Sequence, residues 1–399
     1  MLARNLSTIA LALGIISLGF CADFPPVEAG PLSVTRLDAA AAAAGFKVIE
    51  NKSVIPVAAY SRLPFVSSGY DDERLTALRK THLLEQVTAP ARDEWSAQSL
   101  LKEWVYGKIP LGNPTSPAVH ALDILEKAAR GERFYCTHYA ITYAECATAL
   151  GWQARKLGID RQHGKDGFGS SHHGVAEIWS NQFAKWIAID ANFDLHYEKK
   201  RTPLSAWEVR AEWLRNQGAD VDRVVGVGLH AVKKKLGRVT WHFSEDETAS
   251  YFWNYINSRV VTTDQHDSAK LLFLQDAAND SSLWYQNHDS STNQSRLHTG
   301  YLKSTFAPTR RIEDAYWTVG IVDATLTHVS AKSIYLKLKS YCPNLLAFER
   351  SVDRFVWTRI KDELSVEWPL KAGWNSLVLR TLGRGNVTGP ETTLLLFLE

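Results

Sequence analysis

Three residues of the types used in nucleophilic catalysis occur in the order cysteine, histidine, aspartate, as Cys136, His173 and Asp190. A cysteine attacks carbonyl groups as its thiolate, and a helix N-terminus with a neighbouring imidazole lowers the thiol pKa. A carboxylate that holds the imidazole in one tautomer completes such a triad. These residue types therefore predict attack of a thiolate on an amide or peptide carbonyl.

The spacing of the histidine and the aspartate predicts that they meet. The segments HHGVAEIW and KWIAID read as two short strands, which would form an antiparallel hairpin. With the turn centred between Asn181 and Gln182, His173 faces Asp190 directly, and opposed Cβ atoms lie roughly 4.5 to 5.5 Å apart. A shift of one residue would put the two side chains on opposite faces of the sheet.

The cysteine is placed by a predicted helix. Residues from Cys136 to about Leu150 are rich in alanine and are followed by Gly151, which is typical of a helix and its C-terminal cap. Cys136 would then lie at the positive end of the helix dipole. Amphipathic helices are predicted before it, within residues 92–110 and 118–131. The order of elements predicts an α+β fold with helices packed on a small antiparallel sheet.

These motifs resemble the transglutaminase-like superfamily in order, spacing and flanking residues. Its papain-like core carries a cysteine at the start of a helix and then a histidine and an aspartate on consecutive strands. The resemblance covers about residues 75–215. It implies that Cys136 is the nucleophile, His173 the general base and acid, and Asp190 the orienting residue.

The histidine strand matches the family's pattern with two departures. His173 is preferred to His172 because Glu177 follows four residues later, as in the family's His-x-x-x-Glu strand. Gly174 and Val175 stand where many members of the family have alanine and tryptophan. His172 is interpreted as a loop residue or a neighbour of the site.

The resemblance implies a cysteine-dependent enzyme that acts on carboxamide or peptide bonds of a protein or peptide substrate through a thioester, without a cofactor. Water as acceptor would make it a protease or amidase, and an amine would make it a cross-linking acyltransferase. The alternative is a non-catalytic scaffold of the same fold whose last domain binds a glycan or a protein at the cell surface. The complete set of three residues favours the enzyme, because a scaffold has no physical reason to retain it.

The end of the chain has a different pattern. From about residue 315, short runs of β-branched and aromatic residues separated by turn residues predict a β-sandwich of the immunoglobulin or fibronectin kind. The predicted organisation is a signal peptide or anchor at 1–22, a transglutaminase-like domain at 30–245, a linker or extended loop region at 246–310, and the sandwich at 311–399.

The first residues predict export. Arg4 is followed by an apolar run, which is typical of a secretory signal. An uncleaved anchor remains an alternative, since the uncharged stretch is near the lower limit of a membrane span, about 18 residues. Lipidation at Cys21 is a second alternative. The protein is expected to be periplasmic, extracellular or anchored in the membrane through its N-terminus.

The charge balance and the remaining cysteines and histidines exclude other classes. Lys plus Arg number 45 and Asp plus Glu 43, so no nucleic-acid partner is predicted. Cys146 is interpreted as a core residue, with a bridge to Cys342 as the alternative. No metal is predicted, because the histidines near residues 163–196 do not follow a known ligand spacing. His138 is expected to be partly exposed.

Overall fold

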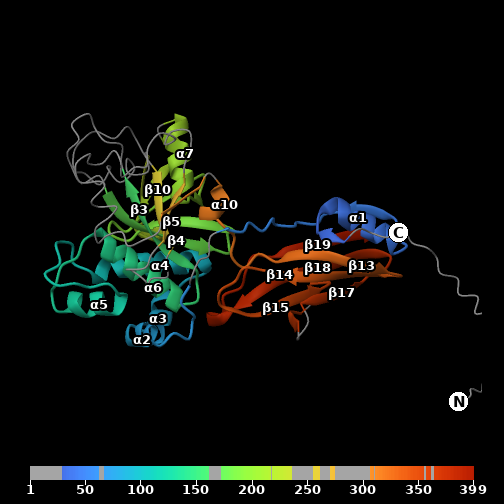
Figure 1. Cartoon of the computed structure of the whole chain (residues 1–399), viewed down its shortest axis with the longest axis horizontal. Helices are drawn as coiled ribbons and strands as arrows, with labels where there is room; N and C mark the ends of the chain where they lie inside the picture. Colours follow the sequence, from blue (N-terminus) through green and yellow to red (C-terminus); the bar gives the residue numbers. More distant parts are fainter. Residues whose placement is uncertain are drawn as a thin grey trace, which may run out of the picture.

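The computed structural model describes residues 29–62, 67–160, 172–216, 218–235, 255–260, 270–274, 306–309, 311–354, 356–360 and 364–399. These residues form two lobes that lie end to end (Figure 1). The first lobe combines helices with an antiparallel sheet, and we call it the α+β domain. The second lobe is built mainly of strands, and we call it the sandwich.

The main helices of the α+β domain include one that is central. They are α2 Glu73–Thr81, α3 Leu84–Thr88, α4 Glu94–Lys108, α5 Ala121–Ala129, α6 Cys136–Ala149 and α7 Ala206–Asn216. The central helix is α6, which packs on β3 and β4 and is covered by α2, α4 and α5. Its residues from His138 onward are buried on every side, as expected of an alanine-rich helix between two layers. The predicted helix beginning at Cys136 is confirmed.

The sheet of the α+β domain has the order β12-β11-β10-β3-β4-β5-β6-β8-β9, with β7 paired to β6. Its strands are β3 Ala154–Asp160, β4 His172–Ser180, β5 Lys185–Asp190, β6 Leu195–Lys199, β7 Thr202–Pro203, β8 Asp222–Val225, β9 Val232–Lys235, β10 Tyr255–Val260, β11 Lys270–Leu274 and β12 Phe306–Thr309. Neighbouring strands are antiparallel except β11 and β12. The predicted α+β class with antiparallel sheets is therefore confirmed.

The prediction of a linker or extended loop region at 246–310 is wrong for the described part of that segment. Strand β10 pairs with β3, and β11 and β12 extend the sheet beyond it. The physical reason is that the outer edge of β3 carries unpaired N–H and C=O groups that a further strand satisfies. Because this segment mixes aromatic and polar residues, its sequence pattern did not indicate these short strands.

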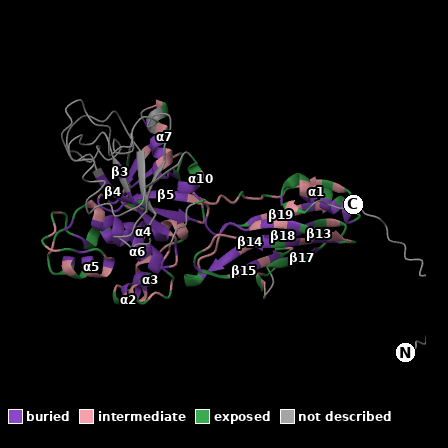
Figure 2. Cartoon of the chain, viewed as in Figure 1, coloured by how far each residue is buried: buried purple, intermediate pink, exposed green. Residues whose placement is uncertain are grey.

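The sandwich consists of two sheets, with the orders β1-β13-β14-β17 and β16-β15-β18-β19-β2. Its elements are β1 Gly30–Pro31, α1 Val34–Ala43, β2 Val48–Asn51, β13 Asp323–Ser330, β14 Ser333–Lys339, β15 Leu345–Val352, β16 Thr358–Ile360, β17 Ser365–Pro369, β18 Gly373–Gly383 and β19 Thr392–Leu398. Leucines of facing strands alternate inward and form the core with Trp368. Figure 2 shows buried residues along strands such as β14, β15 and β18.

The predicted boundary at residue 30 is wrong, because residues 30–51 belong to the sandwich. Strand β1 pairs with β13, and β2 pairs with β19, so the N-terminal segment completes one edge of each sheet. Leu37, Ala40 and Ala41 of α1 are buried in the sandwich core. Pairing between segments so distant in the sequence leaves no local signal, which is why the sequence pattern assigned them to the neighbouring domain.

The two domains meet at an aromatic contact. Trp179 and Trp186 of the α+β sheet are buried against Trp317, which lies between α10 Ile312–Ala315 and β13. The indole Nε1 of Trp186 donates to the Trp317 carbonyl at 2.8 Å. The sandwich therefore joins the α+β domain directly beside β4 and β5.

The predicted signal, anchor or lipidation segment at 1–22 lies outside the described residues. Among the helices in the described ranges, none combines the length and the apolar character that crossing a membrane requires.

Candidate active site

Cys136 is the first residue of α6 and is half-buried. The preceding Tyr135 has an extended backbone and its side chain supplies no capping hydrogen bond. The positive end of the helix dipole thus lies at the thiol, where it favours the thiolate. The Sγ atom also accepts a hydrogen bond from the Gly174 N–H of β4 at 3.3 Å.

His173 and Asp190 are in direct contact. His173 Nε2 lies 2.7 Å from Asp190 Oδ2, and the two residues are only 6% and 3% exposed. Because Nε2 is engaged by Asp190, Nδ1 is the ring nitrogen available to the thiol. The structure thus brings together all three predicted site residues, since Cys136 and His173 also interact through their side chains.

The predicted register of the hairpin is wrong, but the predicted contact between His173 and Asp190 is still formed. The turn comprises residues 181–184, and the pairs Trp179–Trp186 and Glu177–Ala188 place its centre between Gln182 and Phe183. Relative to direct opposition, the strands are displaced by two residues. A displacement of two keeps both side chains on one face, so His173 and Asp190 meet as diagonal neighbours.

The electrostatics of His173 are dominated by its two partners. Burial by itself lowers the pKa of the imidazole, whereas the Asp190 carboxylate and the Cys136 thiolate raise it, and the net result is a pKa of about 10. Below that pH the imidazole carries a proton and a positive charge. The arrangement can therefore hold a thiolate–imidazolium pair with a proton ready for transfer.

Phe193 and the backbone after Asp190 complete the surroundings of the imidazole. The Phe193 ring lies 5.6 Å from the His173 ring, measured between centroids. The Asn192 N–H donates to Asp190 Oδ1 at 3.1 Å, so each carboxylate oxygen has a partner. These contacts hold the carboxylate in place and cover one side of the imidazole. Sequence reasoning missed Phe193, whose position in a short turn gave no signal.

Gly174 allows the start of α6 to approach β4. A Cβ added at Gly174 would lie 2.9 Å from Thr137 Cα, which is closer than side chains tolerate. The glycine noticed in the sequence as a departure from the family thus has a structural reason in this chain. It brings the thiol within reach of the Gly174 N–H.

Replacement of Gly174 by alanine is expected to lower the free energy of unfolding by about 1–3 kcal/mol, because the helix must move away from the strand. Denaturant unfolding measures this change. Gly69→Ala is the matched control, since a Cβ there meets nothing within 4 Å. Equal stability of the two variants would show that α6 does not need this close approach.

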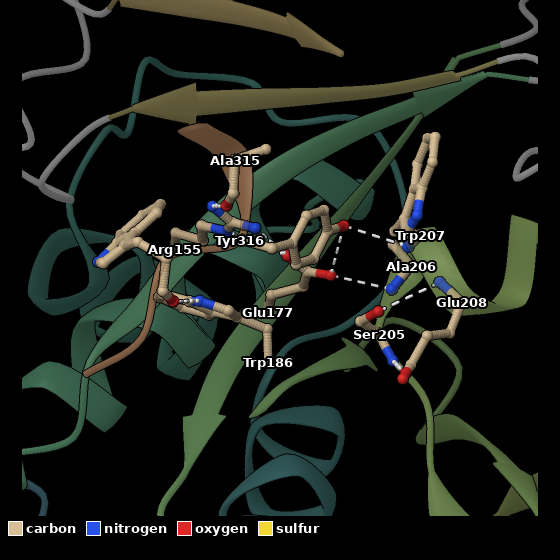
Figure 3. A network of polar contacts seen from close by, with 10 residues as sticks. Arg155, Glu177, Trp186, Ser205, Ala206, Trp207, Glu208, Ala315 and Tyr316 are labelled. Carbon is tan, nitrogen blue, oxygen red and sulfur yellow. Dashed lines mark hydrogen bonds and ion pairs between the residues drawn. The ribbon is translucent and has the colours of Figure 1, made fainter. Parts of the chain in front are cut away.

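Glu177 has a structural environment of its own, four residues after His173 (Figure 3). Its Oε2 accepts from Arg155 Nε at 3.0 Å and Nη2 at 2.6 Å, and both side chains are almost completely buried. Its Oε1 accepts from the Ala206 N–H at 2.9 Å and from the Tyr316 hydroxyl at 3.1 Å. Glu177 therefore joins β3, β4, the start of α7 and the segment that leads to the sandwich.

Arg155 extends this network to the aromatic contact between the domains. Its guanidinium carbon lies 4.3 Å from the Trp186 ring centroid and 4.9 Å from that of Trp317. Its Nη1 donates to the Ala315 carbonyl. Sequence reasoning did not identify Arg155, because nothing in the pattern around a single arginine in a strand indicates that Glu177 is its partner.

The structure confirms the prediction for Cys146 and contradicts the one for His138. Cys146 is buried in the core, as predicted, and in the described part of the chain it forms no bridge to Cys342. His138 is 5% exposed, so the expectation of a partly exposed side chain is wrong. Its ring packs against Phe134 and Tyr135, because the first turn of α6 is covered on both sides.

The remaining histidines considered as metal ligands are described to different extents. His196 Nε2 lies 3.1 Å from Glu198 Oε1 on β6. Of His172, which begins β4, only the backbone is described, and His163 lies outside the described residues. Within the described ranges, no group of three His, Cys, Asp or Glu side chains is arranged to hold a metal ion.

Comparisons with known proteins give distant similarities. No protein-family model and no curated protein matches the chain. One similar solved structure is a provisionally assigned cysteine protease from Cytophaga hutchinsonii, with 12% identity and a TM-score of 0.25 over 45% of this chain and 58% of that one. Another is red sea bream transglutaminase, with 11% identity and a TM-score of 0.26 over 81% of this chain and 72% of that one. The chain thus spans little more than half the length of the first protein.

Proposed function

We propose that this chain is a transglutaminase-like cysteine enzyme with a papain-like core, which cleaves carboxamide or peptide bonds through a thioester. The observation that carries the proposal is the 2.7 Å contact between His173 Nε2 and Asp190 Oδ2, together with the side-chain interaction between His173 and Cys136. A buried histidine with a carboxylate on one nitrogen and a thiol near the other is the arrangement of a base that activates a nucleophile.

The proposed reaction begins from the thiolate–imidazolium pair. Cys136 Sγ attacks the carbonyl carbon of the substrate and forms a tetrahedral oxyanion. When the oxyanion collapses, the C–N bond breaks and His173 gives its proton to the departing amine. The product is a thioester on Cys136. The backbone N–H of Cys136, at the start of α6, is the proposed donor to the oxyanion.

Water or a second amine then attacks the thioester, and His173 takes the proton of the attacking group. Attack by water gives a protease or amidase, and attack by an amine gives a cross-linking acyltransferase. Both outcomes use Cys136, His173 and Asp190 in the same roles. The proposed substrate is a protein or peptide, and the steps proposed here call on no cofactor.

Detection of the thioester tests the proposal. The protein is incubated with glutamine-containing peptides, with and without a fluorescent primary amine, and the mass of the intact protein is measured after an acid quench. We expect an acyl adduct on Cys136 that is missing in Cys136→Ala, together with release of ammonia or of a cleaved amine. An intact Cys136 that never acquires an acyl group from any peptide would contradict an enzyme and favour the scaffold.

Export is proposed on the basis of the N-terminal sequence, with the signal cleaved or kept as an anchor. For the sandwich we propose a role in joining the enzyme to a surface glycan or protein. Its docking beside β4 and β5 through Trp317 supports a fixed position relative to the site. Removal of residues 1–22 should leave thioester formation unchanged, because the site residues all come from α6, β4 and β5.

A further inference from the structure

Lys102 is a fully buried lysine that sequence reasoning did not identify. It lies in α4 with 0% exposure. A lysine is almost never fully buried unless it is paired, because the desolvation of its ammonium group costs several kcal/mol. The residues that pair with Lys102 therefore show what its burial supports.

The partners of Lys102 lie mainly in the turn between β5 and β6. Lys102 Nζ donates to the Asp194 carbonyl at 2.7 Å and lies 2.8 Å from Asp194 Oδ1. It also donates to the Gly226 carbonyl at 3.3 Å. Asp194 has a φ of 52°, which is uncommon for a residue other than glycine. The ammonium group thus fixes a backbone conformation that the turn would not readily adopt alone.

The same turn, residues 191–194, carries contacts of the candidate active site. It follows Asp190 directly, and its Asn192 N–H donates to Asp190 Oδ1. Its Phe193 ring packs 5.6 Å from the His173 ring. The end of the turn is therefore held by Lys102, and the middle of the turn contacts both members of the buried pair.

Charged groups face Lys102 from several elements. They are Asp194 in the turn, Asp190 on β5, Glu103 on α4 itself and His196 on β6. Burial lowers the pKa of Lys102, whereas the carboxylate of Asp194 at short range opposes this change. The positive charge of Lys102 in turn contributes, after burial, to lowering the pKa of His196.

We infer that Lys102 is a positioning residue of the proposed enzyme. It holds turn 191–194 so that Asp190 and Phe193 keep the His173 imidazole in its place beside Cys136. Lys102 itself touches neither the thiol nor the substrate. The inference rests on the proposed function, because it assigns a role relative to the same thiolate–imidazolium pair.

The alkylation of Cys136 by two reagents tests the inference. Iodoacetate is anionic and is favoured over neutral iodoacetamide while His173 carries a positive charge. The ratio of the two rates should therefore fall as pH rises through the pKa of His173, about 10 in the wild-type protein. In Lys102→Met, loosening of the turn weakens the contact with Asp190, and we expect this midpoint to fall by more than one pH unit toward 6.5.

The loss of the charge alone and the loss of positioning have different signatures. Loss of the positive charge by itself would raise the pKa of His173 and move the midpoint upward, whereas displacement of Asp190 moves the midpoint downward. Arg79→Met is the matched control, because Arg79 is 7% exposed and donates to the Ala149 carbonyl at the far end of α6. It should lower stability and leave the midpoint unchanged. An unchanged midpoint in a folded Lys102→Met protein would overturn the inference.

A second variant keeps the test decisive if Lys102→Met does not fold. Phe193 is half-buried, so Phe193→Ala removes the contact of the turn with His173 at a smaller cost in stability. We expect the same downward shift of the midpoint, and an unchanged midpoint would overturn the inference. If the wild-type thiol reacts as a free cysteine, the proposed function itself fails, and this outcome is visible before any variant is made.

Discussion

Replacement of His173 by alanine is expected to raise the midpoint of Cys136 alkylation to about 8.5, the value of an ordinary cysteine. In the wild-type protein the imidazolium stabilises the thiolate, because it offers a positive charge next to Sγ. The pKa of His173 is raised from 6.5 to about 10. The imidazolium therefore persists below about pH 10 and is lost as the pH rises through that value.

The measurement is the rate of labelling by iodoacetamide between pH 5 and pH 10, with the labelled residue identified by peptide mass spectrometry. Site identification separates Cys136 from Cys342, whose thiol pKa is raised to about 11, mainly by burial. His196→Ala is the matched control, since His196 is also buried on the sheet and paired with a carboxylate. It should leave the midpoint of Cys136 in place.

The same substitution should reduce the rate of thioester formation by about 10²- to 10⁴-fold, the usual contribution of a positioned acid and base. A wild-type midpoint near 8.5, unchanged in His173→Ala, would contradict the activated thiol. The search for function would then move to the sandwich as a binding domain.

Replacement of Glu177 by glutamine is expected to lower the free energy of unfolding by about 3–5 kcal/mol, the usual cost of breaking a buried ion pair. The amide cannot neutralise Arg155, which is 2% exposed and would remain charged in the interior. The amide also cannot accept every hydrogen bond that the carboxylate accepts from Arg155, Ala206 and Tyr316. Urea unfolding followed by tryptophan fluorescence measures the change, because Trp186 lies against Arg155.

Two further variants identify the origin of this loss. Glu126→Gln removes the partner of Arg130 in an exposed pair on a helix, and it should cost about 0.5 kcal/mol or less. In the double variant Arg155→Met and Glu177→Leu, neither charge of this pair remains, so part of the stability should return. A loss near 1 kcal/mol in Glu177→Gln would show that water reaches the pair in solution.

Local patterns predicted the parts of the fold that depend on near neighbours in the sequence. The alanine-rich segment begins its helix at Cys136, as predicted, because helix formation depends on residues three and four positions apart. The amphipathic helix now seen as α4 follows the same rule. Short apolar runs that follow a loop rich in turn residues likewise identified β4 and β5 as strands of a hairpin.

The contact between His173 and Asp190 was predicted because both side chains lie on one face of the sheet. The strands are two residues out of the predicted register, because the turn at 181–184 is longer than the pattern indicated. Parity alone decides which face a side chain occupies, and an even displacement preserves it. The contact therefore forms in spite of the incorrect register. Phe193 and turn 191–194 add tertiary contacts to both residues.

The sequence by itself determined the residue types of the candidate site, the start of the central helix and the common face of His173 and Asp190. Only the tertiary structure decided that residues 30–51 complete the sandwich, that Arg155 neutralises Glu177, and that Lys102 holds the turn after Asp190. The physical reason is that strand edges and buried charges are satisfied by partners distant in the chain. Such partners leave no periodic pattern near the residue that they stabilise.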